Sequence, residues 1–132
     1  MMRESWLPAE PESATHARGL VREAAAEQGL DEDGAWSLVL ATSEAVSNAI
    51  LHGTACPGKG ILVRLMPWND GLCVEVCDCG GFDSAPLPPG PEATHGRGIP
   101  IIAAVVDHLE VTADGPLTRV RFAKAGRRLA AA

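Results

Sequence analysis

The sequence predicts an α+β domain: a two-layer sandwich in which helices cover one face of a mixed, mostly antiparallel sheet. Two observations lead to this prediction. Two helical patterns, over residues 12–28 and 33–53, precede the first clear strand, and the later strands come in pairs joined by turns. Paired strands do not alternate with helices as they would in a Rossmann fold. The order helix, helix, hairpin, loop, helix, hairpin therefore favours helices on one side of the sheet.

Length and composition are those of one globular domain, residues 1–132, with a core of about 6–123 and loosely held termini. A hydrophobic fraction of 46% with 21% charged residues excludes general disorder. Eleven Lys and Arg stand against seventeen Asp and Glu, a net charge of -6. Because this charge repels a phosphate backbone, nucleic-acid binding is not expected.

The chain has no apolar run of the ~20 residues that cross a bilayer, and its start lacks an apolar signal region. A cytoplasmic protein without membrane contact is therefore expected. Four cysteines, Cys56, Cys73, Cys77 and Cys79, include no CxxC pair, which disfavours zinc. The expectation is reduced thiols that act as small apolar side chains on or beside a strand.

The first two elements are expected to be helices. "SWLPAEPES" is extended by its prolines, and a helix then begins at Glu12 or Ser13 and ends at Gly29. Asp31 or Asp33 caps a longer helix, which Gly53 ends. Apolar residues recur at helical spacing in both segments: Ala17, Leu20, Val21 and Ala24 in the first, and Leu38, Ala41, Ala45, Val46, Ala49 and Ile50 in the second.

Two hairpins and a short helix follow. "ILVRLMPW", the "WNDG" reversal and "LCVEVCD" predict a hairpin that ends at Asp78, with alternate residues of its second strand buried. Residues 79–95 hold three glycines and four prolines, too many for a regular helix or a central strand. "GRGIPIIAAVVDH" predicts a short helix with Pro100 in its first turn, and "LEVTA", "DG" and "TRVRF" predict the last hairpin.

Glu44, Asn48 and His52 are spaced i, i+4, i+8, so they lie along one side of the second helix. The plain alternative is the solvent face of an amphipathic helix. Two further features favour a binding site. Asp78, before "CGG", is a carboxylate that can accept from an amino group, although it can also be a simple turn residue. "GRGI", residues 96–99, opens a helix whose backbone N–H groups suit phosphate, or is a plain turn.

Together these pieces predict a nucleotide site, with an amide oxygen that suits Mg²⁺. The sequence here resembles the GHKL superfamily of ATP-binding domains, the Bergerat fold of histidine kinases and gyrase B, and more narrowly the bacterial anti-sigma factor serine/threonine kinases. The resemblance runs from "LPAEPESATHARGLVREA" to "TRVRF". "EAVSNAILHG" matches the family's N box, "DCGG" partly matches its first glycine box, and "HGRGIPII" matches its second.

The resemblance implies a role for each matching residue. Asn48 would be a ligand of Mg²⁺, and Glu44 would be the general base of phosphoryl transfer. Asp78 would accept a hydrogen bond from the adenine amino group, with Gly80 beside it. In the second glycine box Gly96 and Gly98 face the phosphates and Ile99 follows them; Arg97 reaches a phosphate or faces solvent. Thr118 matches a position near adenine loosely, and His52 lines the site or simply finishes its helix. The segment between the boxes is the ATP lid, where Phe82 replaces the usual second glycine.

The function implied is an ATP- and Mg²⁺-dependent protein kinase that phosphorylates an anti-sigma factor antagonist and switches between that partner and a sigma factor. The alternative is a module that binds ATP and a protein without transferring phosphate. A plain structural protein requires three motifs in family order by chance. A histidine kinase is disfavoured because the chain holds no phospho-acceptor histidine domain. The resemblance also suggests a homodimer.

Overall fold

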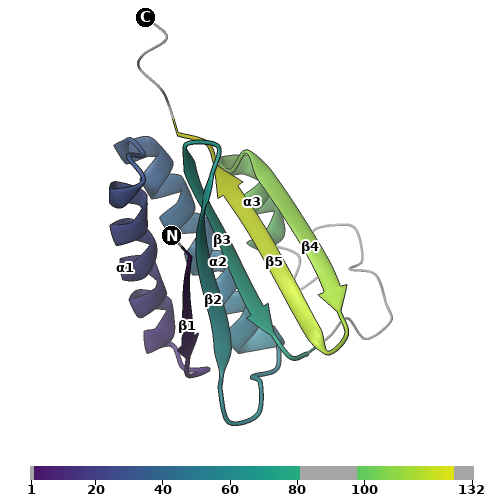
Figure 1. Ribbon diagram of the computed structural model, residues 1–132. Coiled ribbons are helices and arrows are strands. Elements are labelled where there is room, and N and C mark those ends of the chain that lie inside the picture. The colour runs from purple at the N-terminus through teal and green to yellow at the C-terminus, as the bar shows by residue number, and fades with distance from the viewer. Residues whose placement is uncertain (1, 81–97, 127–132) are drawn as a thin grey trace, which may run out of the picture.

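The computed structural model describes residues 2–80 and 98–126 (Figure 1). Strands β1, β2, β3, β5 and β4 form one sheet in that order, and every neighbouring pair is antiparallel. All three helices of the described residues lie on one face. The predicted two-layer α+β sandwich is confirmed. The elements are β1 Arg3–Leu7, α1 Glu12–Glu27, α2 Glu32–His52, β2 Ile61–Trp68, β3 Gly71–Asp78, α3 Gly98–Val105, β4 His108–Asp114 and β5 Leu117–Lys124.

Strand β1 was not expected as a sheet strand from the sequence. It pairs with β2, with Arg3 opposite Leu65 and Leu7 opposite Ile61. Exposed and less exposed residues alternate over only five positions, and Pro8 follows directly. The sequence therefore indicates an extended segment but does not show which strand it pairs with. The pairing places Arg3 against α1, where its guanidinium contacts Glu23 and Glu27.

The helix ends follow their capping residues. Gly29 has a φ of 77°, the left-handed conformation that ends α1 and redirects the chain. Asp31 caps α2, because its Oδ1 accepts from the backbone N–H of Gly34 at 2.7 Å. At the other end the N–H of Gly53 donates to the carbonyl of Ala49 at 3.0 Å. Gly53 ends α2 as predicted, and the helix begins at Glu32, one residue before the predicted segment 33–53.

The hydrophobic core lies between the helices and the inner face of the sheet. Leu38 and Val46 of α2 and Phe122 of β5 are fully buried there. Helix α2 packs over β3 and β5, between α1 and α3 (Figure 1). Arg18 of α1 donates to the hydroxyl of Ser43 at 3.1 Å and so marks the flank of α2 that faces α1. The opposite flank of α2 faces α3.

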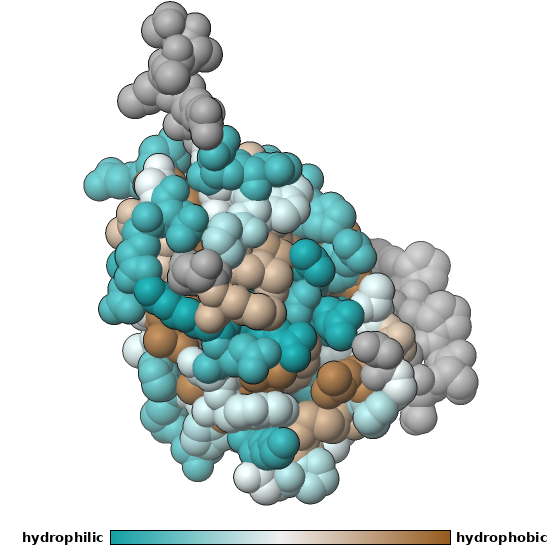
Figure 2. Space-filling view, viewed as in Figure 1, coloured by the Kyte–Doolittle hydropathy of each residue, from teal (hydrophilic) through white to brown (hydrophobic). Residues whose placement is uncertain are grey.

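The outer face of the sheet carries a row of alternating charges, one from each strand. The strand registers place Glu4, Arg64, Glu75, Arg121 and Glu110 side by side. Glu75 is only 4% exposed, and its carboxylate pairs with Arg64 at 3.5 Å and Arg121 at 3.2 Å. Figure 2 looks onto this face, where hydrophilic residues cross the sheet between apolar ones.

Strand β3 is buried on both faces, whereas the sequence predicted burial of alternate residues. Its outer residues include Cys73 and Cys77, which are free thiols with no exposed surface, as expected for small apolar side chains. Long arginine side chains from β2 and β5 cover this outer row. The burial of β3 therefore depends on Glu75, because its carboxylate forms the ion pairs that hold those arginine side chains over the strand.

We expect Glu75→Gln to lower the free energy of unfolding by about 2 kcal/mol, because it leaves partly covered arginines without their anion. The matched control is Glu110→Gln in the same row, whose carboxylate side chain is 50% exposed. That control should change stability by no more than about 0.5 kcal/mol. Urea unfolding measures the free energy of unfolding of both variants. Equal losses would show that the ion pairs of Glu75 do not hold the arginines in place.

Candidate functional site

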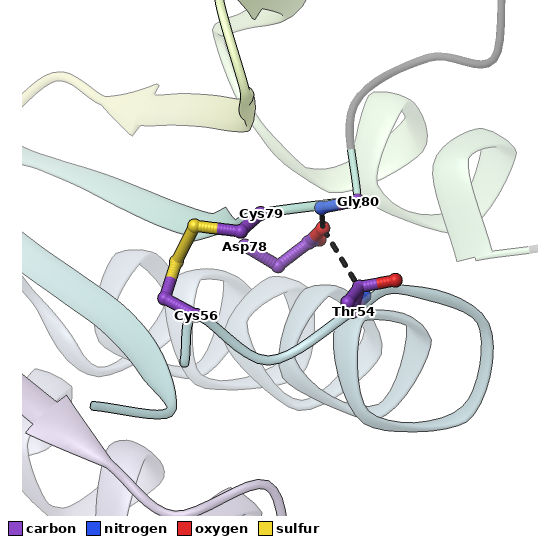
Figure 3. Close-up of a disulfide and its surroundings, with 5 residues drawn as sticks. All are labelled: Thr54, Cys56, Asp78, Cys79 and Gly80. Carbon is purple, nitrogen blue, oxygen red and sulfur yellow. Dashed lines mark hydrogen bonds between the residues drawn. A yellow bond between two sulfur atoms is a disulfide. The ribbon is translucent and has the colours of Figure 1, made fainter. Parts of the chain in front are cut away.

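Asp78, the last residue of β3, is the centre of the candidate site. It is 8% exposed, and its Oδ1 accepts from the backbone N–H of Gly80 at 2.7 Å and of Thr54 at 3.4 Å (Figure 3). Thr54 follows the end of α2, so one carboxylate joins two elements that are distant in sequence. Two backbone donors fix its orientation. A buried carboxylate held in this way can accept a hydrogen bond from a ligand.

Two glycines lie directly against this carboxylate. A Cβ added to Gly53 would be 2.6 Å from Oδ2 of Asp78 and 2.6 Å from the carbonyl oxygen of Ala49. A Cβ on Gly80 would be 2.9 Å from Oδ1. A side chain at Gly53 would have to displace the carboxylate and the backbone of α2, and one at Gly80 would have to displace Oδ1 of Asp78. Sequence reasoning placed Gly80 beside Asp78 but interpreted Gly53 as a helix end alone and gave Thr54 no role.

Thr118 lies beside Asp78 on the neighbouring strand. The two residues are partners in the β3–β5 register, so their side chains share the face toward the helices. The hydroxyl oxygen of Thr118 is buried and has no hydrogen-bond partner among the described residues. A buried hydroxyl is costly without a partner. An acceptor and an unpartnered hydroxyl, side by side, suit the edge of a flat heterocycle that carries both a donor and an acceptor.

Glu44 and Asn48 lie on the flank of α2 that faces α3. Successive residues of a helix are about 100° apart, so these two lie on the other side of the buried stripe from Ser43. Both are partly buried. Neither side chain has a hydrogen bond or ion pair within residues 2–80 and 98–126. His52, on the same stripe, is exposed at the last position of α2.

Of the second glycine motif, the structure describes the part that begins α3. Gly98 is the first residue of this helix and Ile99, which is partly buried, is the second. Pro100 lies in the first turn as predicted. Gly96, Arg97, Phe82 and the segment expected to be a lid lie outside the described residues. Backbone N–H groups of a first helical turn have no partners within their own helix and can bind an anion.

The prediction that all four cysteines are reduced is wrong. Cys56 and Cys79 form a disulfide, which joins the segment after α2 to the residue after Asp78 (Figure 3). The two are 23 residues apart, and only the fold brings them together, so the sequence spacing gave no signal. Their thiolates are not available to a metal. Within the described residues, no group of three His, Cys, Asp or Glu side chains is placed to hold one.

Gly53→Ala should destabilise the protein by about 1–3 kcal/mol, because the added methyl must displace either Asp78 or the last turn of α2. Gly19→Ala is the matched control, since this exposed α1 position has nothing within 4 Å of an added Cβ. That variant should gain about 0.5–1 kcal/mol from helix propensity. Thermal unfolding compares the two, and a neutral Gly53→Ala would contradict the close packing at Asp78.

Comparisons with known proteins agree with this fold. The family model of the histidine kinase-like ATPase domain matches residues 7–124. No curated protein matches the chain. Among solved structures, the chain is similar to the crystal structure of the RsbU and RsbW domains of Rv1364c from Mycobacterium tuberculosis, with 25% identity and a TM-score of 0.74.

That similarity covers 97% of this chain and 33% of the other, so this chain spans about a third of its length. No helix in the described segments is both long and apolar enough to cross a bilayer. The match over residues 7–124 includes all three helices and strands β2 to β5. The chain belongs to the histidine kinase-like ATPase family.

Proposed function

We propose that this protein binds ATP with Mg²⁺ and transfers the γ-phosphoryl group to a serine or threonine of an anti-sigma factor antagonist. The observation that carries the proposal is the position of Glu44 and Asn48. They are partly buried, without partners among the described residues, and lie on the flank of α2 whose end meets Asp78. A carboxylate and an amide one turn apart suit proton transfer beside a magnesium ligand.

The residues around Asp78 fit adenine. Its carboxylate would accept from the adenine amino group, and the unpartnered hydroxyl of Thr118 would bind the neighbouring ring edge. Gly53 and Gly80 keep side chains away from this carboxylate. The first turn of α3, beginning at Gly98, supplies N–H groups for phosphate. Gly96 and Arg97 are proposed to extend that phosphate contact.

The amide oxygen of Asn48 would hold Mg²⁺, which would supply positive charge against the phosphates of ATP. This matters in a protein of net charge -6, which otherwise repels the anion. Glu44 is one helical turn before Asn48, so it would receive the proton of the attacking hydroxyl. Leu51, 72% exposed near this flank, offers an apolar contact to the protein that brings the hydroxyl.

The second candidate is an ATP-dependent binding module that holds an antagonist or a sigma factor without phosphoryl transfer. The exposed side chain of Leu51 also supports this second candidate. A binding module needs a contact surface for a protein partner but no general base. The chain's similarity to a structure containing an RsbW domain supports an anti-sigma role in either case. A cytoplasmic location and a homodimer are part of the proposal.

Two variants separate the candidates. With radiolabelled ATP and antagonist proteins from the same genome, Glu44→Gln should lower phosphate transfer at least ~100-fold and leave the ATP Kd within about threefold. Asn48→Ala should weaken binding roughly tenfold or more in Mg²⁺ and much less in EDTA, because it removes only the metal ligand. Titration calorimetry and phosphate incorporation provide the two readouts. Transfer that survives Glu44→Gln would reject Glu44 as the base, and no transfer by the wild type would favour the binding module.

A further inference from the structure

We propose that Cys56 and Cys79 form a redox-modification site that controls nucleotide affinity, with the disulfide form binding more tightly than the dithiol form. This inference rests on the proposed nucleotide site. The disulfide joins the segment after α2 to the residue that follows Asp78. It therefore lies between the two chain segments that orient the carboxylate proposed to bind adenine.

The hydrogen bonds at this point show what the disulfide holds. The N–H of Cys79 donates to the carbonyl of Thr54 at 2.8 Å, and the N–H of Thr54 donates to Oδ1 of Asp78. The second of these is 3.4 Å long, the weaker of the two bonds to that oxygen. The disulfide thus keeps a weak donor in place (Figure 3).

Loss of the disulfide should act locally. The segment around Cys56 has its own bonds, since the N–H of Cys56 donates to the carbonyl of Gly60 at 2.7 Å and the N–H of Gly60 donates back at 2.9 Å. Strand β3 is paired on both sides as far as Cys77. Reduction therefore leaves the sheet intact and frees the contact between Thr54 and Asp78. A less preorganised acceptor binds its ligand more weakly.

The exchange is an ordinary thiol–disulfide reaction with a dithiol reductant. A thiolate of the reductant attacks the sulfur of Cys79, which is partly exposed, and Cys56 leaves as a thiolate and takes up a proton. The second thiol of the reductant then displaces Cys79, so two protein thiols form and the reductant becomes a disulfide. Cys73 and Cys77 do not compete, because both are buried and burial raises the pKa of each thiol.

The test is titration calorimetry of the full chain with Mg²⁺–ADP, in the air-oxidised form and after dithiothreitol. Thiol counting should find two free thiols before reduction and four after it, and circular dichroism should find the fold unchanged. We expect the Kd to rise about tenfold on reduction. The variant Cys56→Ala with Cys79→Ala should have the weaker Kd under both conditions, whereas Cys73→Ala with Cys77→Ala should keep the response.

Equal ADP affinity in the folded oxidised and reduced forms would overturn the redox inference and leave the nucleotide site standing. Four free thiols in the air-oxidised protein would overturn it as well, since no disulfide would then exist to act. Absence of ADP binding in either form would reject the nucleotide site itself, and this inference with it. A response that persists in the Cys56→Ala, Cys79→Ala variant would assign the effect to other groups.

Discussion

The carboxylate of Asp78 is the constraint on which the site depends. It ends β3, accepts from the segment after α2, and lies beside Thr118 of β5, so it ties three elements together at one edge of the sheet. Gly53 and Gly80 lie against it, because a Cβ at either position would come within 3.0 Å of one of its oxygens. The flank of α2 that bears Glu44 and Asn48 ends at the same carboxylate.

The two faces of the sheet differ in whether their buried or partly buried polar groups have partners within the protein. On the outer face, Glu75 is surrounded by arginines from β2 and β5, so its charge is compensated inside the protein. On the helix side, Thr118 and the Glu44–Asn48 flank lack partners among the described residues. An unpartnered hydroxyl beside a buried carboxylate, with further unpaired polar groups on the same side of the sheet, suits a ligand site. The helix side is therefore where binding is proposed.

Local patterns predicted most of the fold, and long-range contacts explain what they missed. Local sequence predicted the helix caps Asp31 and Gly53 and the two hairpins, because residues close in sequence determine each of these features. Strand β1, the disulfide and the role of Thr54 were not, because each depends on a partner more than twenty residues away. For the site, the motifs supplied candidate residues such as Asp78 and Thr118, but only the fold places them beside Thr54. Their proposed roles remain predictions.

We propose above all that Asp78 recognises the amino group of adenine. The most direct measurement is titration calorimetry of the oxidised protein with ADP and with inosine diphosphate, which has a carbonyl where adenine has its amino group. Inosine diphosphate should bind at least ~10-fold more weakly than ADP, because a carbonyl oxygen then faces a carboxylate. Asp78→Asn should narrow the difference between the two affinities. Equal affinity for the two nucleotides in the wild type would contradict this role of Asp78.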